Sequence, residues 1–357
     1  MLHKPYYNPS KSYEENFKDG PFGVFAKNKK FKESKIPEYK IFGYPVNLPF
    51  GIPAGPVLNS KFVRAAFNNG FDLVVYKTVR SDSYPCHPHP NVLHVNLKGD
   101  LTMERAKKPL VADKKYLEPL SITNSFGVPS KKPADWQKDA ARAVKYENRG
   151  KLMIMSFMGT VKPDQSEKEF ISDFTRAAKL ALRTKAKIYE VNLSCPNIGN
   201  EGLVCYNLSV TEKVLKGIRK VLGKKPLIVK TGYFQEDREL KKFALIVNKY
   251  ADAIAAINTI AAPVVDNKGQ QALPGSPVRL KSGICGAAIK WAGIDMVKRL
   301  SKIKKANNYK FAIFGVGGVM KVKDYFEYRE AGADVVMSAT GSMWNPYLAQ
   351  EIKKHER

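Results

Sequence analysis

Two amides and a thiol follow one apolar run in the middle of the chain, where the sequence reads Ile-Tyr-Glu-Val-Asn192-Leu-Ser-Cys195-Pro-Asn197. The run predicts a buried strand, and the amides of Asn192 and Asn197 can donate to and accept from a flat heterocycle with alternating C=O and N–H groups. Cys195 lies between them and is a candidate base. The motif alone also fits a plain strand end, in which Asn, Ser and Pro terminate the strand and Cys195 is a small buried apolar residue.

Other polar side chains end apolar runs in the same way. They are Lys77, Lys230 and Asn258, and Asn124 is expected on a loop before the third strand. Because the carboxyl ends of parallel strands meet at one rim, we expect these residues to bind a polar planar ligand together. The lysines could polarise carbonyl oxygens or stabilise a developing anion, although each lysine alone also fits a salt bridge at the rim.

The elements that would position these residues alternate along the chain. Short apolar runs separated by amphipathic stretches predict parallel strands joined by crossover helices. The expected strands are residues 50–54, 73–77, 152–157, 188–192, 227–230, 253–258, 311–315 and 335–338, and the expected helices are residues 61–69, 133–148, 167–184, 211–222, 237–250, 287–305, 322–331 and 346–355. The Pro133 and Pro346 starts fit a proline in the first helical turn. Eight strands predict an α/β fold, a closed (β/α)8 TIM barrel.

Three segments lie outside this alternation. Residues 1–44 predict an N-terminal arm, which leaves residues 45–357 as the barrel domain. Residues 80–123 follow the second strand, and the alternation of residues 91–98 predicts an accessory hairpin. Residues 261–282 are rich in Gly and Pro and predict an irregular loop over the barrel mouth. Both insertions are expected at the carboxyl-terminal face, where barrel enzymes carry their sites.

Composition limits the class of protein. The chain has 357 residues, 44% of them hydrophobic, and a formal net charge of +27. The lysines are spread in small clusters without a recognisable nucleic-acid motif, so we expect a solvated basic surface and no specific nucleic-acid partner. A non-enzymatic basic barrel that binds RNA or a protein through these lysines remains an alternative. The start lacks an apolar signal region and residues 243–265 are interrupted by polar residues, so we expect a cytoplasmic protein without a membrane span.

The four cysteines are widely spaced and form no CxxC pair, which argues against a zinc ribbon, an iron–sulfur cluster and a disulfide framework. The compact segment Cys86-His-Pro-His89-Pro is a poor tetrahedral site by itself. We therefore expect no metal and four free thiols.

Small residues gather after the seventh and eighth expected strands. The segment Gly315-Val-Gly317-Gly318 is expected to open a helix, and Ser338-Ala-Thr340-Gly341 follows the last strand. Such residues let backbone N–H groups approach an anion, at the usual phosphate position of barrel enzymes. Glycines needed only for tight turns are the other interpretation.

Several motifs occur in a fixed order over about residues 45–350: Ile52-Pro-Ala54-Gly55, Tyr76-Lys77-Thr78, Ile122-Thr-Asn124-Ser-Phe126-Gly127-Val-Pro129, Asn192-Leu-Ser-Cys195-Pro-Asn197, Val229-Lys230, Ile257-Asn258-Thr259, Ser282-Gly-Ile-Cys-Gly286 and Gly315-Val-Gly317-Gly318. Their order and spacing resemble those of the FMN-dependent dihydroorotate dehydrogenases. The resemblance implies that Cys195 is the catalytic base. It implies that substrate is bound by Lys77, Asn124, Phe126, Gly127, Asn192, Asn197, Asn258 and Thr259. It implies that FMN is bound by Ala54, Gly55, Lys77, Thr78, Asn192, Lys230, Asn258, Gly286, Gly317, Gly318, Thr340 and Gly341.

The cysteine places this resemblance in the class 1 branch, because the membrane-bound class 2 branch uses serine. The implied chemistry is removal of the C5 proton of dihydroorotate by Cys195 with hydride transfer from C6 to flavin N5. An ordinary thiol pKa of ~8.5 predicts activity that climbs as the pH approaches that value. The resemblance also favours a homodimer that uses fumarate, while a quinone or an NAD-linked electron-transfer subunit remains open.

Two segments, residues 59–70 and 199–205, look closer to the pyrimidine-reducing barrel of dihydropyrimidine dehydrogenases. That relative typically has His where this chain has Asn197, and it lacks a counterpart of Asn124. We therefore favour orotate chemistry, with an FMN-dependent dihydrouracil/uracil enzyme as the alternative. Ala339, where the family commonly has glycine, also departs from the pattern.

Overall fold

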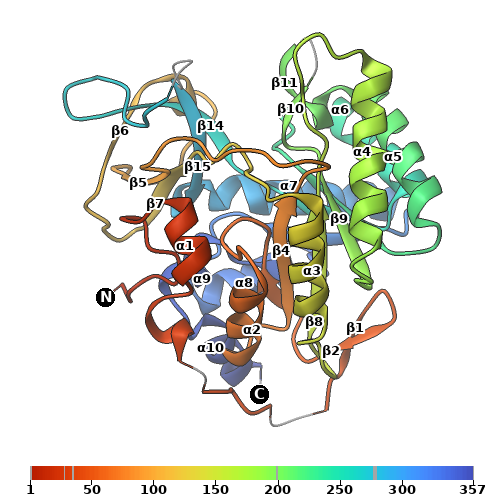
Figure 1. Ribbon diagram of the computed structural model, residues 1–357, viewed down its shortest axis with the longest axis horizontal. Coiled ribbons are helices and arrows are strands. Elements are labelled where there is room, and N and C mark those ends of the chain that lie inside the picture. Colours follow the sequence, from red (N-terminus) through yellow and green to blue (C-terminus); the bar gives the residue numbers. More distant parts are fainter. Residues whose placement is uncertain (1, 28, 34–35, 198–199, 276–279, 357) are drawn as a thin grey trace.

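Eight parallel strands close into one barrel, as the alternation predicted (Figure 1). The computed structural model describes residues 2–27, 29–33, 36–197, 200–275 and 280–356. Around the barrel the order is β12-β13-β16-β17-β3-β4-β8-β9, and β9 pairs with β12 to close it. The strands are β3 (Phe50–Ile52), β4 (Leu73–Val79), β8 (Leu152–Phe157), β9 (Ile188–Asn192), β12 (Leu227–Thr231), β13 (Ala253–Ala256), β16 (Ala312–Val316) and β17 (Val335–Met337).

All eight expected helices are present and surround the barrel. They are α2 (Ser60–Asn68), α3 (Pro133–Val144), α4 (Glu167–Leu182), α5 (Leu208–Leu222), α6 (Asp237–Tyr250), α7 (Lys290–Ala306), α8 (Val322–Glu330) and α10 (Leu348–His355). Pro133 begins α3, as predicted. The prediction for Pro346 was wrong: α10 begins two residues later, after Asn345 accepts a hydrogen bond from the backbone N–H of Tyr347.

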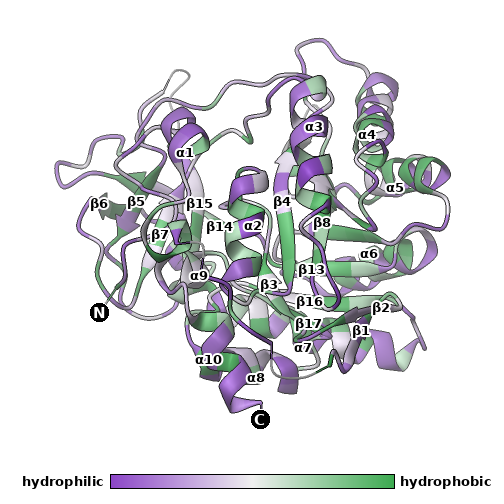
Figure 2. Cartoon of the chain, turned by 60° about the horizontal axis from the view of Figure 1, so that its bottom comes forward, coloured by the Kyte–Doolittle hydropathy of each residue, from purple (hydrophilic) through white to green (hydrophobic). Residues whose placement is uncertain are grey.

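The apolar core has two layers because successive residues of a strand point to opposite faces of the sheet. In β4, Leu73 and Val75 belong to the cluster inside the barrel, whereas Val74 and Tyr76 pack in the larger cluster that includes the surrounding helices. Figure 2 shows the hydrophobic strands inside a more polar rim of helices. The strands are thereby held rigidly, and the side chains at their carboxyl ends are fixed with them.

The two insertions join into a second, five-stranded closed barrel, and here the sequence interpretation was incomplete. The segment after β4 supplies β5 (Val92–Val95), β6 (Leu110–Asp113) and β7 (Ser121–Asn124), and the segment after β13 supplies β14 (Ile260–Val265) and β15 (Lys281–Gly286), in the order β14-β15-β7-β5-β6. The prediction of an irregular loop at residues 261–282 was wrong at both ends, where β14 and β15 pair as antiparallel strands, whereas residues 266–275 between them belong to neither strand. Asn124, expected on a loop, is the last residue of β7.

The N-terminal segment packs against the barrel. It contains α1 (Tyr13–Asp19) and a hairpin of β1 (Tyr39–Ile41) and β2 (Tyr44–Val46). Tyr6 and Tyr7 are buried; the backbone N–H of Tyr6 donates to the carbonyl of Met343 in the short helix α9 (Thr340–Trp344). Tyr7 makes an edge-to-face contact with Phe126 at 5.6 Å between ring centroids. The segment therefore touches the loop that carries the expected substrate residues.

A buried ionic cluster ties both ends of the chain to the barrel. Asp72 is fully buried and pairs with Lys353 of α10 at 2.7 Å, while Asn47 donates to its other oxygen at 3.1 Å. Lys353 also pairs with Glu33 at 2.8 Å. Burial outweighs Lys353 and raises the pKa of Asp72 to about 6.

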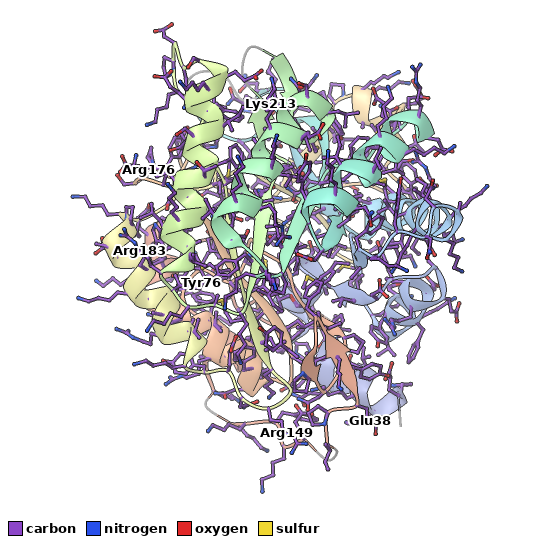
Figure 3. All side chains as sticks on the ribbon, turned by 90° about the vertical axis from the view of Figure 1, so that its right-hand side faces the viewer. Glu38, Tyr76, Arg149, Arg176, Arg183 and Lys213 are labelled. Atoms are coloured by element: carbon purple, nitrogen blue, oxygen red, sulfur yellow. The ribbon has the colours of Figure 1, made fainter. Side chains whose placement is uncertain are left out.

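The basic surface lies largely on the outer faces of the helices. Figure 3 shows Arg176 on α4, Arg183 directly after it and Lys213 on α5 projecting from the side of the barrel, and all three are exposed. None of the helices in the described part of the chain combines the length and apolar character needed to cross a bilayer.

Candidate active site

Two buried lysines, Lys77 of β4 and Lys230 of β12, lie at the carboxyl end of the barrel, and β8 and β9 separate their two strands. Lys77 lies two residues inside the end of β4, where its ammonium donates to the carbonyls of Thr78 at 3.2 Å and Pro129 at 3.4 Å. Burial, with the positive charge of Arg80 adding to it, lowers the pKa of Lys77 to about 7. A negatively charged ligand beside this amine would restore its full positive charge.

Lys230 of β12 belongs to a polar chain that crosses the barrel interior. Its ammonium donates to the carbonyl of Ala54 at 3.1 Å, and it interacts with the buried carboxyl of Glu190 on β9. Ser156 donates to Glu190 at 2.8 Å and exchanges a hydrogen bond with Thr78 at 2.9 Å. Burial lowers the pKa of Lys230 and raises that of Glu190. Residues from β4, β8, β9 and β12 are thus joined beneath the rim.

Cys195 lies three residues beyond β9 and is 3% exposed. Its thiol donates to the carbonyl of Asn192 at 3.4 Å, which favours the protonated form. Burial raises the pKa of Cys195 to about 12, against the opposing positive charge of Arg80. The ordinary thiol pKa assumed from sequence is therefore too low for this pocket, since desolvation penalises the thiolate.

The turn that holds this thiol is well organised. The side-chain oxygen of Asn192 accepts from the backbone N–H of Ser194 at 3.0 Å, and Val204 donates to the carbonyl of Cys195 at 3.0 Å. Asn192 is also the register partner of Lys230 on the adjacent strand β12. Asn197 lies in the backbone pair β10 (Pro196–Asn197) and β11 (Asn200–Leu203), and its side chain lies outside what the structure describes.

Asn124 reaches the site from the second barrel. It pairs with Gly283 of β15, and its amide donates to the Gly283 carbonyl at 3.4 Å and to the Cys285 sulfur at 3.5 Å. A side chain at Gly283 would collide with the hydroxyl of Thr259. Asn124 and Thr259, 135 positions apart in the chain, therefore meet at one glycine. Phe126 and Gly127 follow in the loop beneath Tyr7, with the Gly127 carbonyl held by Arg80 at 2.9 Å.

The glycine-rich ends of β16 and β17 line one small cavity. Its walls include Asn258, Cys285, Gly286, Gly317, Gly318 and Thr340. Gly317 and Gly318 have φ of +124° and +67°, and a side chain at Gly318 would collide with Lys290. Gly341 lines an adjoining pocket that shares Gly318 and Met320. The sequence prediction that this segment opens a helix was imprecise, since α8 begins four residues after Gly318.

The structure thus gathers most of the expected residues into two connected groups. The first group lies at the barrel rim and comprises Ala54, Lys77, Thr78, Asn192, Cys195 and Lys230. In the second group, Asn258 lines the glycine-rich cavity and precedes Thr259 in the chain. Gly55 follows Ala54, is exposed, and has open space where a side chain would extend.

Three residues of the site were missed from the sequence: Arg80, Ser156 and Glu190. A charged residue inside the apolar run of β9 was the available signal for Glu190, because such residues are buried only with partners. Ser156 and Arg80 offered no comparable signal, since their neighbours come from other strands.

Comparison with known proteins agrees with this geometry. A family model described as dihydroorotate dehydrogenase matches residues 106–355. The chain is 37% identical to a dihydroorotate dehydrogenase of Dictyostelium discoideum over 98% of this chain and 97% of that protein. It is 31% identical to the catalytic subunit of dihydroorotate dehydrogenase B (NAD(+)) of Brachyspira hyodysenteriae over 51% of this chain and 58% of that protein. It is 29% identical to the subunit of the same name from Thermodesulfovibrio yellowstonii over 66% of this chain and 72% of that protein. On its sequence match and its barrel, this chain belongs to the dihydroorotate dehydrogenase family.

Proposed function

We propose that this chain oxidises dihydroorotate to orotate, with FMN as its cofactor and Cys195 as the base. Family membership supports the reaction and makes the chain an oxidoreductase of pyrimidine biosynthesis that acts on a CH–CH bond. The observation that carries the proposed mechanism is the burial of Cys195 on the same barrel end as Lys77 and Lys230. Among the described ion pairs Lys77 has no carboxylate partner, and a thiol with two amines suits a planar anionic substrate.

In this mechanism the thiolate of Cys195 takes the proton from C5 of dihydroorotate, forming an S–H bond as the C5–H bond breaks. FMN, when bound, supplies the acceptor for the hydride that leaves C6. The electron pair of the broken C5–H bond forms the C5–C6 double bond, while the pair of the C6–H bond leaves with the hydride. Lys77 lies beside the loop of Asn124 to Pro129 and supplies positive charge for the substrate carboxylate. Asn124, Asn192, Asn197 and Asn258 would present amides to the pyrimidine edges.

The residues present fit a flavin phosphate. Gly286, Gly317 and Gly318 all have positive φ and turn the backbone around a small cavity, and Thr340 contributes to its wall. Lys230, which donates to the carbonyl of Ala54 at the rim, and Asn258, in the wall of the cavity, would contact the flavin ring. Ala54 and Gly55 border the same end of the barrel through the Lys230 hydrogen bond.

We further propose a cytoplasmic homodimer that acts without a partner subunit and passes its electrons to fumarate. The full-length match to the Dictyostelium protein supports a stand-alone chain, whereas the NAD(+)-linked catalytic subunits match over shorter stretches. Fumarate, a quinone and NAD+ offered separately to the reduced protein would identify the acceptor. Sedimentation of the purified protein would measure its assembly.

Absorbance of the purified protein tests the function most directly. Flavin bands are expected, with FMN rather than FAD released on denaturation. Anaerobic dihydroorotate should bleach these bands, and dihydrouracil should not. Bleaching by dihydrouracil alone would transfer the assignment to a dihydropyrimidine enzyme, and a colourless protein that cannot take up FMN would favour a non-enzymatic basic barrel.

A further inference from the structure

Arg80 is a buried arginine that joins three parts of the proposed site. It follows β4 directly and is 6% exposed. Its guanidinium donates to the carbonyls of Gly127 at 2.9 Å and Val128 at 2.9 Å, both in the loop after β7. It also donates to the carbonyl of Gly159 at 3.2 Å and the hydroxyl of Thr160 at 3.0 Å, both beyond β8. One side chain therefore fixes the substrate loop against the barrel rim.

The charge of this guanidinium has no carboxylate partner among the described ion pairs. Its polar contacts are neutral carbonyls and a hydroxyl, and the ring of Tyr84 lies 4.1 Å from its central carbon. Asp173 interacts with Arg80 electrostatically, but its two oxygens accept hydrogen bonds from Ser81 and from the backbone N–H of Thr160 at 2.9 Å. A buried charge is costly unless it is paired, and Asp173 offsets this one without a direct ion pair among the described residues.

Two titratable groups of the site experience the field of Arg80. Its positive charge opposes the effect of burial on the pKa of Cys195, and it adds to the lowering of the pKa of Lys77. Cys205, packed behind Cys195, acts on Cys195 in the opposite direction. Besides Asp173, a further negative charge near Arg80 can arise in two ways: ionisation of Cys195, or binding of an anionic substrate.

We propose that Arg80 is a positioning residue of the site, fixing the Gly127–Val128 segment through its carbonyls and supplying the positive charge that favours the thiolate of Cys195. The effect of Arg80 on turnover rests on the proposed function, because Cys195 is the base only in that mechanism. The effect of Arg80 on the ionisation of the Cys195 thiol does not depend on that function.

The test compares Arg80→Gln, which removes the charge, with Arg80→Lys, which keeps it and loses the planar fork. Alkylation of Cys195 by iodoacetamide at pH 9 is followed by mass spectrometry of its peptide, with buried Cys205 as an internal reference for opening of the fold. Loss of about one pKa unit of thiolate stabilisation corresponds to a tenfold lower rate. We expect that loss in Arg80→Gln, with the rate in Arg80→Lys close to that of the wild type.

The second readout is kinetic. Both variants should raise the KM for dihydroorotate because both lose carbonyl contacts to the substrate loop, whereas only Arg80→Gln should move the alkaline rise of kcat to higher pH. Arg219→Gln is the matched control: Arg219 donates to the carbonyls of Tyr250, Gly223 and Lys225 and pairs with Asp252 at 2.6 Å, remote from the rim. Neither readout should change in that variant.

Unchanged or faster alkylation of Cys195 in Arg80→Gln, at an unchanged Cys205 rate, would overturn the proposal. If Arg80→Gln cannot be isolated folded, Arg80→Lys decides: a kept alkylation rate with a raised KM supports the proposal, and an unchanged KM contradicts it. Full turnover in Cys195→Ala would instead refute the base of the proposed function while leaving the alkylation result intact.

Discussion

Replacement of Cys195 by alanine isolates the proposed proton transfer from cofactor binding. The side chain touches the turn after β9, and none of the glycines of the phosphate cavity. Removal of one buried sulfur should cost about 1 kcal/mol of folding free energy, on the scale of other single-atom deletions in cores. We therefore expect a folded protein that binds FMN normally.

The expected kinetic loss is much larger. A positioned base contributes about 10²- to 10⁴-fold, which corresponds to roughly 3–5 kcal/mol of barrier. Because burial raises the pKa of Cys195 to about 12, only a small and pH-dependent fraction is thiolate near neutrality. Wild-type turnover should accordingly rise about tenfold per pH unit through the alkaline range while proton transfer limits the rate, without levelling near 8.5.

The assay is the rate of flavin bleaching by dihydroorotate in single turnover, measured from pH 7 to pH 10 beside the FMN content of each protein. Cys205→Ala is the matched control, since Cys205 is also buried and burial raises its pKa to about 11. It should keep a rate at least as high as that of the wild type, and any shift of the alkaline rise should be to lower pH, because Cys205 raises the pKa of Cys195. Bleaching by Cys195→Ala at a near-normal rate, with the same rise in pH, would refute the reasoning.

Three further changes test other parts of the molecule. Gly317→Asp adds a strained side chain and a negative charge to the phosphate cavity and should abolish FMN binding in a folded protein, whereas Gly223→Asp, at another positive-φ glycine with open space, should keep FMN bound. Absorbance measures the bound FMN and circular dichroism the fold. A folded Gly317→Asp protein that retains its flavin bands would contradict the assignment of this cavity to the phosphate. Asn197→Ala should weaken inhibition by orotate by ~1–3 kcal/mol and the binding of uracil by less. Equal losses for the two ligands would mean that Asn197 contacts the pyrimidine edge that orotate and uracil share. Lys353→Met leaves buried Asp72 without its ammonium partner and should lower the free energy of unfolding by about 3–5 kcal/mol in urea titrations. An unchanged midpoint would show that the pair does not stabilise the fold.

The main barrel was predictable because each of its elements carries a local signal. Apolar runs of strand length alternate with amphipathic helices, and tertiary packing shifted their ends by only a few residues. The strand of Ile188–Asn192 and the helix of Asp237–Tyr250 have the predicted bounds. The order of strands around the barrel then follows from the right-handed crossover rule.

The second barrel was not predictable from local pattern, since its strands satisfy their hydrogen bonds with partners far away in the chain. Residues 261–265 fell within the predicted loop because Gly269, Pro274, Gly275 and Pro277 follow them closely, although β14 alternates between buried and more exposed positions as a strand does. The same limit applied to the site: Cys195 and the lysines stood at recognisable strand ends, whereas Arg80 gains its surroundings from the loops after β7 and β8.

The pairing of β14 with β6, and of β15 with β7, makes the two insertions one inherited unit. A change of length in either insertion would leave strand edges of the other without partners, so the two should evolve together, and a chimera that exchanges only one of them with a relative should aggregate or misfold. Exchange of both insertions together would transfer Asn124 along with Gly283 and Cys285, to which its amide donates. With the role proposed here for Asn124, we expect a transfer of substrate preference to or from this barrel to require both insertions together.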